Sequence, residues 1–343
     1  MTATDTTLDA GALPDFTKGT VNLASARLGA RGLSATDEFF APLERMLEDA
    51  PARFLPDVYD DNGKWMDGWE SRRKRVEGHD VAVIRLAMPG RIFGFDVDTS
   101  FFTGNYPPHC RIEAAFIADG EPLDDTQWVE VLAKSPLGPS AHHYFAASGE
   151  GIWTHIRLHI FPDGGVARLR VFGAAFFDWD KVGPTEEVDL AYIYNGAKSL
   201  AWSDAHYGHP DQMLGPGRGI NMGDGWETAR RRGPGHDWAI IKLGAPGIIS
   251  RVVVDTAHFK GNYPDSCALF GAYLPDHSDS FADAELAASA QWTPILARQK
   301  LQMDHIHEFS GETLQLDGPV THVRFAMHPD GGVSRLRLFG HKA

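Results

Sequence analysis

The stretch Ile152-Trp153-Thr154-His155-Ile156-Arg157-Leu158-His159-Ile160 alternates between apolar and polar residues. Strict alternation is typical of a β-strand that buries one face, here the face that carries the isoleucines and Leu158. A turn signature follows at Pro162-Asp163-Gly164-Gly165, and a second alternating run spans residues 168–172. Short strands separated by such turns favour an antiparallel β-sandwich.

The same pattern occurs twice in the 343 residues. Two motifs return 157 residues later and a third returns after 167: DGWE at 67–70 and 224–227, GNYP at 104–107 and 261–264, PDGG at 162–165 and 329–332. Self-similarity at a fixed spacing indicates a duplicated structural unit. We therefore predict an all-β protein of two tandem homologous modules, residues 20–178 and 188–343, joined by a linker near 178–187.

The remaining segments give further strands and few helices. Strands are predicted at 81–86 and 91–97 around a Pro89-Gly90 turn, at 112–118, and at 238–243, 249–254 and 268–274 in the second copy. Two helices are predicted, Asp37–Ala50, with Thr36 as a cap and Pro42 as an unfavourable residue, and Phe281–Ala290.

Composition limits the partners. The net charge of −14 disfavours binding to nucleic acid or to an anionic membrane. The first twenty residues resemble no secretory leader, and no stretch has the length of a membrane span. Cys110 and Cys267 occupy equivalent places in the two copies, so we expect two buried thiols rather than a disulfide, and a cytoplasmic location.

Familiar catalytic signatures such as a P-loop, HExxH, GxSxG or paired CxxC motifs are absent from the sequence. Polar loops shared by the copies remain. Glu70 and Arg73 in the first copy match Glu227 and Arg230 in the second. A guanidinium beside a carboxylate could bind a small anion, because arginine grips carboxylates in a bidentate manner. A solvated ion pair is the alternative for these residues.

A second loop set follows an apolar strand in each copy. Asp98 and Asp255 end these strands, and Asn105 and Asn262 stand in the following loops. The aspartates could act as bases, bind a metal or cap the turn. The copies differ at one informative position, where His258 of the second copy replaces Phe101 of the first.

A third set lies on the alternating strands. His155 and Arg157 share the face opposite the isoleucines, and Arg324 is the counterpart of Arg157. These side chains could line a groove or face water. The PDGG aspartates are interpreted as turn residues.

The DGWE, GNYP and PDGG blocks, in order and in both copies, resemble the allantoicase family from about Asn22 to Gly340. The resemblance implies two jelly-roll β-sandwiches like galactose-binding or discoidin domains. It also implies hydrolysis of allantoate to ureidoglycolate and urea in allantoin and purine degradation, and a homo-oligomer. The alternative is a tandem jelly-roll protein that binds a ligand without catalysis.

Allantoate carries one carboxylate and two ureido groups, which suggests roles for the motif residues. Carboxylate binding is assigned to arginines, and ureido contacts to asparagines: Arg73, Arg230, Arg157 and Arg324; Asn105 and Asn262. We predict that Glu227 or Asp255, with His258, transfers protons. A divalent metal is compatible with the acidic residues, but no ligand spacing requires one. The sequence leaves open which copy holds the site.

Overall fold

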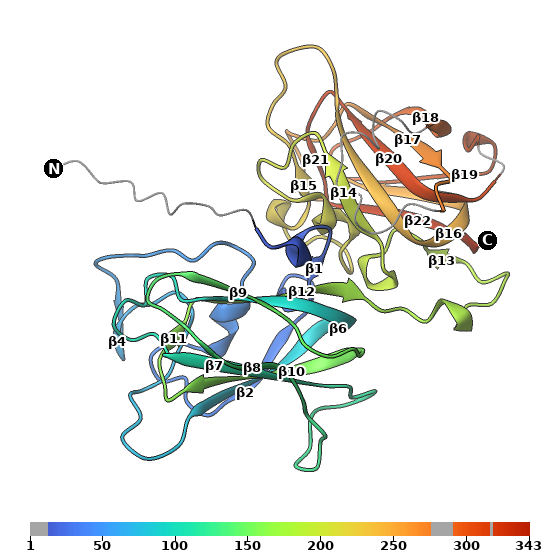
Figure 1. The fold of residues 1–343 in the computed structure, drawn as a ribbon. Coiled ribbons are helices and arrows are strands. Elements are labelled where there is room, and N and C mark those ends of the chain that lie inside the picture. Colours follow the sequence, from blue (N-terminus) through green and yellow to red (C-terminus); the bar gives the residue numbers. More distant parts are fainter. Residues whose placement is uncertain (1–12, 276–290, 316–317) are drawn as a thin grey trace. The chain divides into compact units, whose positions relative to one another are not determined.

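The computed structural model describes residues 13–275, 291–315 and 318–343. The chain forms two compact units (Figure 1). The first extends to Gly173 without the short segments Arg27–Gly29 and Met88–Gly90, and these two segments group with the second unit, which continues from Ala174. Both are all-β sandwiches with short 3-10 turns, so the predicted all-β fold of two tandem jelly rolls is confirmed. None of the helices among the described residues is long and apolar enough to cross a membrane.

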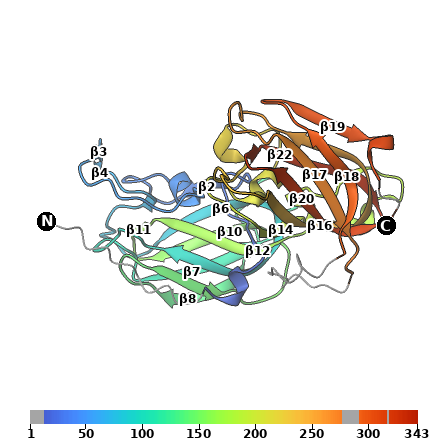
Figure 2. The ribbon, with the colours of Figure 1, turned by 90° about the horizontal axis from the view of Figure 1, so that it is seen from above.

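The first unit contains these strands and 3-10 turns: η1 (Asp15–Thr17), β1 (Val21–Asn22), β2 (Arg31–Ala35), η2 (Leu43–Leu47), β3 (Tyr59–Asp60), β4 (Gly63–Lys64), β5 (Trp69–Glu70), β6 (Asp80–Asp98), β7 (His109–Ala115), β8 (Val129–Pro136), β9 (His142–Ala146), β10 (Trp153–Phe161), β11 (Gly165–Val166) and β12 (Arg168–Ala175). The strand order is β1-β12-β6-β10-β7-β8, and β2 and β9 also pair with β6. Figure 2 shows β6, β10 and β7 running side by side.

The long strand β6 belongs to both layers of this sandwich. Its first half pairs with β2 at residues 82–85, and its second half pairs with β9 at residues 94–98. The turn predicted at Pro89-Gly90 is therefore wrong, because the backbone stays extended there. A strand that bends from one sheet into the other forms the corner of such a sandwich.

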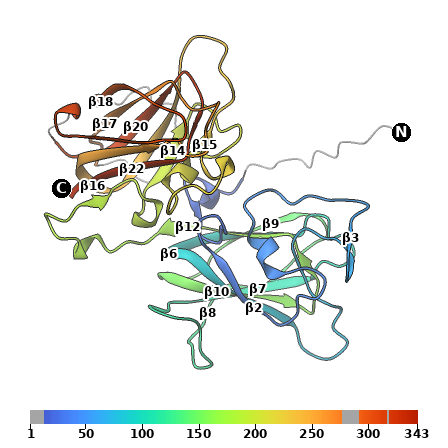
Figure 3. The same cartoon turned by 180° about the vertical axis from the view of Figure 1, so that it is seen from behind.

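The second unit repeats this arrangement with these elements: η3 (Trp179–Lys181), β13 (Val188–Asp189), η4 (Ile193–Asn195), β14 (Lys198–Trp202), η5 (Pro210–Leu214), η6 (Met222–Asp224), β15 (Trp226–Glu227), β16 (Asp237–Asp255), β17 (Ser266–Ala272), β18 (Thr293–Lys300), β19 (Ile306–Ser310), η7 (Gly311–Thr313), β20 (Val320–His328), β21 (Gly332–Val333) and β22 (Arg335–Lys342). Strand β16 is again continuous, with β14 beside its first half and β22 beside its second (Figure 3). The predicted break between 243 and 249 is wrong for the same reason.

The face predicted for the core of β10 is buried, although His155 and His159 on the opposite face are buried as well. Ile156, Leu158 and Ile160 on β10 are fully buried. Trp69 and Trp226 are also fully buried, and each indole N–H donates to a backbone carbonyl. Both cysteines are free and buried, as expected, and burial raises the pKa of each thiol to about 12.

The helix predicted at Asp37–Ala50 is wrong. Only the 3-10 turn η2 forms, with Pro42 as its extended N-cap residue. Thr36 does not cap a helix, because its hydroxyl donates to Asp80 at 2.7 Å. Ala41 forms a β-bridge with Glu70, which holds this segment extended. The second predicted helix, Phe281–Ala290, lies outside the described residues.

Candidate active site

Three sequence motifs meet at one end of the first unit. Strand β5 of the DGWE motif pairs with β11 of the PDGG motif, with Glu70 opposite Gly165. The Gly165 N–H donates to the carbonyl oxygen of Asn105 at 2.8 Å, which brings in the GNYP loop. Gly164 has φ +136° and its Cβ would lie 2.6 Å from that carbonyl, so the close approach requires glycine.

The second unit builds the same junction. Strand β15 pairs with β21, and Glu227 lies opposite Gly332. The Gly332 N–H donates to the Asn262 carbonyl oxygen at 2.8 Å. Much of the sequence that the two copies share therefore consists of residues that form this loop junction.

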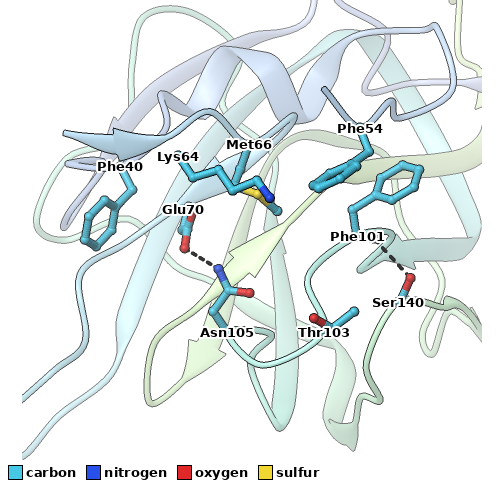
Figure 4. Close-up of a pocket in the computed structure, with 9 residues that line it drawn as sticks. All are labelled: Phe40, Phe54, Lys64, Met66, Glu70, Phe101, Thr103, Asn105 and Ser140. Carbon is cyan, nitrogen blue, oxygen red and sulfur yellow. Dashed lines mark hydrogen bonds between the residues drawn. The ribbon is translucent and has the colours of Figure 1, made fainter. Parts of the chain in front are cut away.

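A glutamate and an asparagine face each other at each junction. Asn105 Nδ2 donates a hydrogen bond to Glu70 Oε1 (Figure 4), and Asn262 Nδ2 donates to Glu227 Oε1. Glu70 is 8% exposed. Burial raises the pKa of the Glu70 carboxyl, although the hydrogen bond from Asn105 acts in the opposite direction. The raised pKa favours the protonated form of the Glu70 carboxyl group.

Glu70 and Asn105 line a cavity of about 470 Å³ in the first unit (Figure 4). That volume lies within the ~300–1,000 Å³ range of small-molecule sites. The lining residues are aromatic, polar and cationic: Phe40, Phe54, Lys64, Met66, Glu70, Phe101, Thr103, Asn105 and Ser140. Lys64 extends its amino group toward the Phe54 ring, 4.3 Å from the ring centre. The cavity thus combines one cation, one buried carboxyl group and amide and hydroxyl groups.

Phe101 forms one wall of this cavity in a left-handed backbone conformation with φ +69°. Its ring stacks on Phe54 with centroids 5.7 Å apart, and its N–H donates to Ser140 Oγ at 3.1 Å. Asp98 fixes the turn by accepting the Ser100 N–H at 2.7 Å. Asp98 therefore caps the turn, which is one of the three alternatives predicted for this aspartate.

The predicted proton-transfer residues of the second unit lie on the equivalent loops. His258 has φ +71°, and its Nε2 lies 2.6 Å from the Gly219 carbonyl oxygen. Asp255 accepts the Ala257 N–H at 2.8 Å and pairs with Arg218 at 3.0 Å. Among the described residues, Glu227, Asp255 and His258 make no hydrogen bond with one another.

The four predicted arginines do not line the Glu70 cavity. Arg73 and Arg230 are exposed. Arg157 pairs with Glu113 on the sheet and lies over the Trp128 ring, whereas Arg324 lies over the Trp238 ring. Burial lowers the pKa of Arg324.

Lys64 is the cavity cation that motif reading missed. It stands three residues before the DGWE motif, and its counterpart in the second copy is Asn221. That difference between the copies is the signal that would have found it. Within the described ranges, no three His, Cys, Asp or Glu side chains group closely enough to hold a metal ion.

The two arginines that follow the PDGG motifs are structural. Arg168 pairs with Asp67 at 2.9 Å and Arg335 pairs with Asp224 at 2.7 Å, and all four side chains are buried. Both arginines also donate to backbone carbonyls. The aspartates of the DGWE motifs therefore anchor the loops that carry the glutamates.

The fold defines a protein of two tandem jelly-roll modules, and the first module contains a polar cavity of a size that suits a small molecule. The family model described as the allantoicase repeat matches residues 21–176 and 188–343. The chain belongs to the allantoicase family.

Relatives named "Probable allantoicase" cover nearly the whole chain. The protein of Rhizobium meliloti is 56% identical, over 96% of this chain and 96% of its own. That of Stutzerimonas stutzeri is 57% identical, over 93% of this chain and 96% of its own. A crystal structure of allantoicase from Saccharomyces cerevisiae superposes with a TM-score of 0.79 at 35% identity, over 94% of each chain.

Proposed function

We propose that this chain is a hydrolase that converts allantoate to ureidoglycolate and urea, in the breakdown of allantoin and purines. The carrying observation is the match of both modules to the allantoicase repeat, with 56% identity to a relative across 96% of this chain. The test is urea release from allantoate by the purified protein. Absence of urea would favour the alternative, a ligand-binding protein without catalysis.

We propose the Glu70 cavity of the first module as the place of reaction. Lys64 is the cation that binds the substrate carboxylate, in place of the four arginines considered from the sequence. Asn105, already fixed beside Glu70, offers its amide to a ureido group. Phe54 and Phe101 form an apolar wall that limits water around the reacting groups.

The reaction cleaves the bond between the central carbon of allantoate and one ureido nitrogen. Protonated Glu70 gives its proton to the leaving nitrogen, and the lone pair of the remaining ureido nitrogen forms a C=N bond. Water then adds its oxygen to the central carbon, and its proton returns to the Glu70 carboxylate. The balance is one water consumed and one urea released. A raised pKa suits a carboxyl group that acts first as an acid and then as a base.

The second module offers a competing location, with Glu227, Asp255 and His258 for proton transfer, Asn262 for a ureido group, and Arg230 and Arg324 for the carboxylate. The shared Glu–Asn pair supports it. The matched variants Glu70→Gln and Glu227→Gln distinguish the two sites. We expect Glu70→Gln to lower kcat about 100-fold or more, as for loss of a general acid, and Glu227→Gln to keep most of the activity. The reverse result would place the reaction in the second module.

We also propose that the chain forms a homo-oligomer. The supporting argument is its place in a family whose members are expected to associate. Size-exclusion chromatography with light scattering is the test, and we expect a multiple of the 37.7 kDa chain mass. A mass equal to one chain would contradict this.

We propose a cytoplasmic location. The supporting observation is that Cys110 and Cys267 are both free thiols, as is common in reducing compartments. Fractionation of cells that express the protein is the test. Recovery in a secreted or membrane fraction would contradict this location.

A further inference from the structure

A second cavity, of about 430 Å³, lies in the first module and shares Phe101 with the Glu70 cavity. Its polar lining comes from three neighbouring strands, a turn and η1: Asp96, Asp98, Ser100, His142, Tyr144, Arg170 and Thr17. No step of the reaction described above uses these groups. Asp98 contributes only by capping the turn that holds Phe101.

Strand pairing places the charged groups together. Asp96 and Asp98 lie two residues apart on β6 and therefore share a face, and in the register of β9 Asp98 lies opposite His142. His142 Nδ1 is 2.8 Å from Asp96 Oδ2, and His142 Nε2 is 3.8 Å from Asp98 Oδ2. The hydrogen bond to Asp96 raises the pKa of His142, which favours its cationic form.

Asp96 has one oxygen without a partner. Its side chain is 2% exposed, and its Oδ1 is buried with no hydrogen-bond partner among the described residues. A buried carboxylate oxygen left unpaired is unfavourable, because it has lost its hydrogen bonds to water without replacement. The cavity that Asp96 lines is the place from which a ligand could supply the missing donor.

The second module shows that the fold does not need this arrangement. At the equivalent positions of β16 and β19, Val253 lies opposite Glu308, and Asp255 lies opposite Ile306. Asp96 and His142 are thus replaced by a valine and an isoleucine. The turn-capping aspartate is kept, as Asp255, and Arg170 is kept as Arg337. A costly buried pair present in one copy alone points to a ligand rather than to folding.

The charges define the kind of ligand. The two carboxylates disfavour an anion, and His142 together with Arg170 disfavours a cation. A neutral group that offers several N–H donors and one carbonyl acceptor satisfies both sets. We propose that this cavity binds a ureido group, with Asp96 and Asp98 accepting its N–H groups and His142 or Arg170 donating to its carbonyl.

The inference rests on the proposed function, because allantoate hydrolysis supplies two sources of this chemistry. One is the second ureido arm of the bound substrate, and the other is the released urea. Phe101 borders both cavities, so either source lies close to the reaction.

The test compares Asp96→Asn with wild type and with Val253→Ala, the matched position of the second module. We expect Asp96→Asn to raise either KM for allantoate or the inhibition constant of added urea about tenfold or more, the effect of losing a hydrogen bond to a charged group. A rise in KM identifies the substrate arm, and a rise in the inhibition constant identifies urea. Val253→Ala should leave both constants within about twofold of wild type.

His142→Gln is the second variant, because His142 is 45% exposed and its replacement should leave the fold intact. The same constant should rise in this variant. Folded Asp96→Asn and His142→Gln proteins with both constants within about twofold of wild type would overturn the inference. Ligand-observed NMR with urea alone tests binding without turnover. If wild type binds urea and Asp96→Asn does not, the cavity is supported even when allantoate is not a substrate. If wild type shows no urea signal, or if the variant shows the same signal as wild type, urea is not the occupant.

Discussion

The buried Glu70 carboxyl group is needed for the proposed reaction, but its ionised form lowers the stability of the fold. Its folded-state pKa is raised by burial, so its contribution to stability is fully present at low pH and is lost as pH rises through that pKa. We expect Glu70→Gln to be more thermostable than wild type at pH 8, because glutamine carries no charge and can still accept the Asn105 hydrogen bond. The gain should vanish near pH 4. A thermal-unfolding series across pH measures this, with Glu227→Gln as the control.

Asn105 affects the pKa of the same carboxyl group. Its hydrogen bond favours the charged form of Glu70, so Asn105→Ala should raise the pKa of Glu70 further. Since the first step requires protonated Glu70, kcat/KM should fall as pH rises through this pKa. We therefore expect the alkaline limb of the pH profile to move to higher pH in Asn105→Ala and to stay in place in Asn262→Ala. An unmoved limb in both variants would remove Glu70 from this role.

At the scale of elements, the bent strand is the feature on which each sandwich depends. Gly247 stands at the bend of β16, where a Cβ would lie 2.6 Å from Leu190 Cδ1 and 2.8 Å from the His341 carbonyl oxygen. We expect Gly247→Ala to destabilise the protein by about 1–3 kcal/mol through overpacking. Gly261→Ala is the control, because nothing lies within 4 Å of its Cβ position. Equal unfolding temperatures for the two variants would contradict this account of the bend.

The break predicted at Pro89-Gly90 shows what local patterns miss. Pro and Gly commonly mark turns, and residues on either side alternate as separate strands would. Whether the backbone turns back or continues depends on which strands flank it. Here β2 and β9 flank the two halves of β6, in different layers, and these pairings join residues far apart in the chain.

At the scale of the whole molecule, the two copies share the buried pairs that hold their loops, but they differ in residues that line the Glu70 cavity, such as Lys64. The buried pairs Arg168–Asp67 and Arg335–Asp224 are equivalent. We therefore expect Arg168→Met and Arg335→Met each to cost about 3–5 kcal/mol, because each leaves a buried aspartate uncompensated. Calorimetry measures both losses. A loss in only one variant would show that the two modules differ in what holds their loops.

The candidate site was predicted in part. Asn105 was predicted as a ureido contact, because it lies within a repeated motif. Glu70 was considered only together with Arg73, and its pairing with Asn105 was found in the structure. Lys64, Phe54 and Ser140 come from separate loops that only the folded chain brings around Glu70. The emphasis on His258 came from its difference from Phe101. The structure shows that both residues occupy the same left-handed position, and the proposed roles of the two modules await the matched variants.

The sequence by itself determined the two-module organisation, the all-β class and the family, because alternation, turn residues and repeated motifs are local and occur twice. It also determined that Ile156, Leu158 and Ile160 of β10 face the core, since a strand has a period of two, but not that His155 and His159 on the opposite face are buried as well. Tertiary structure alone decided the strand crossing at the sandwich corner, the cation beside Glu70, and the Asp96–His142 pair. Each of these depends on contacts between segments distant in sequence, which strand register and loop packing fix only when the chain is folded.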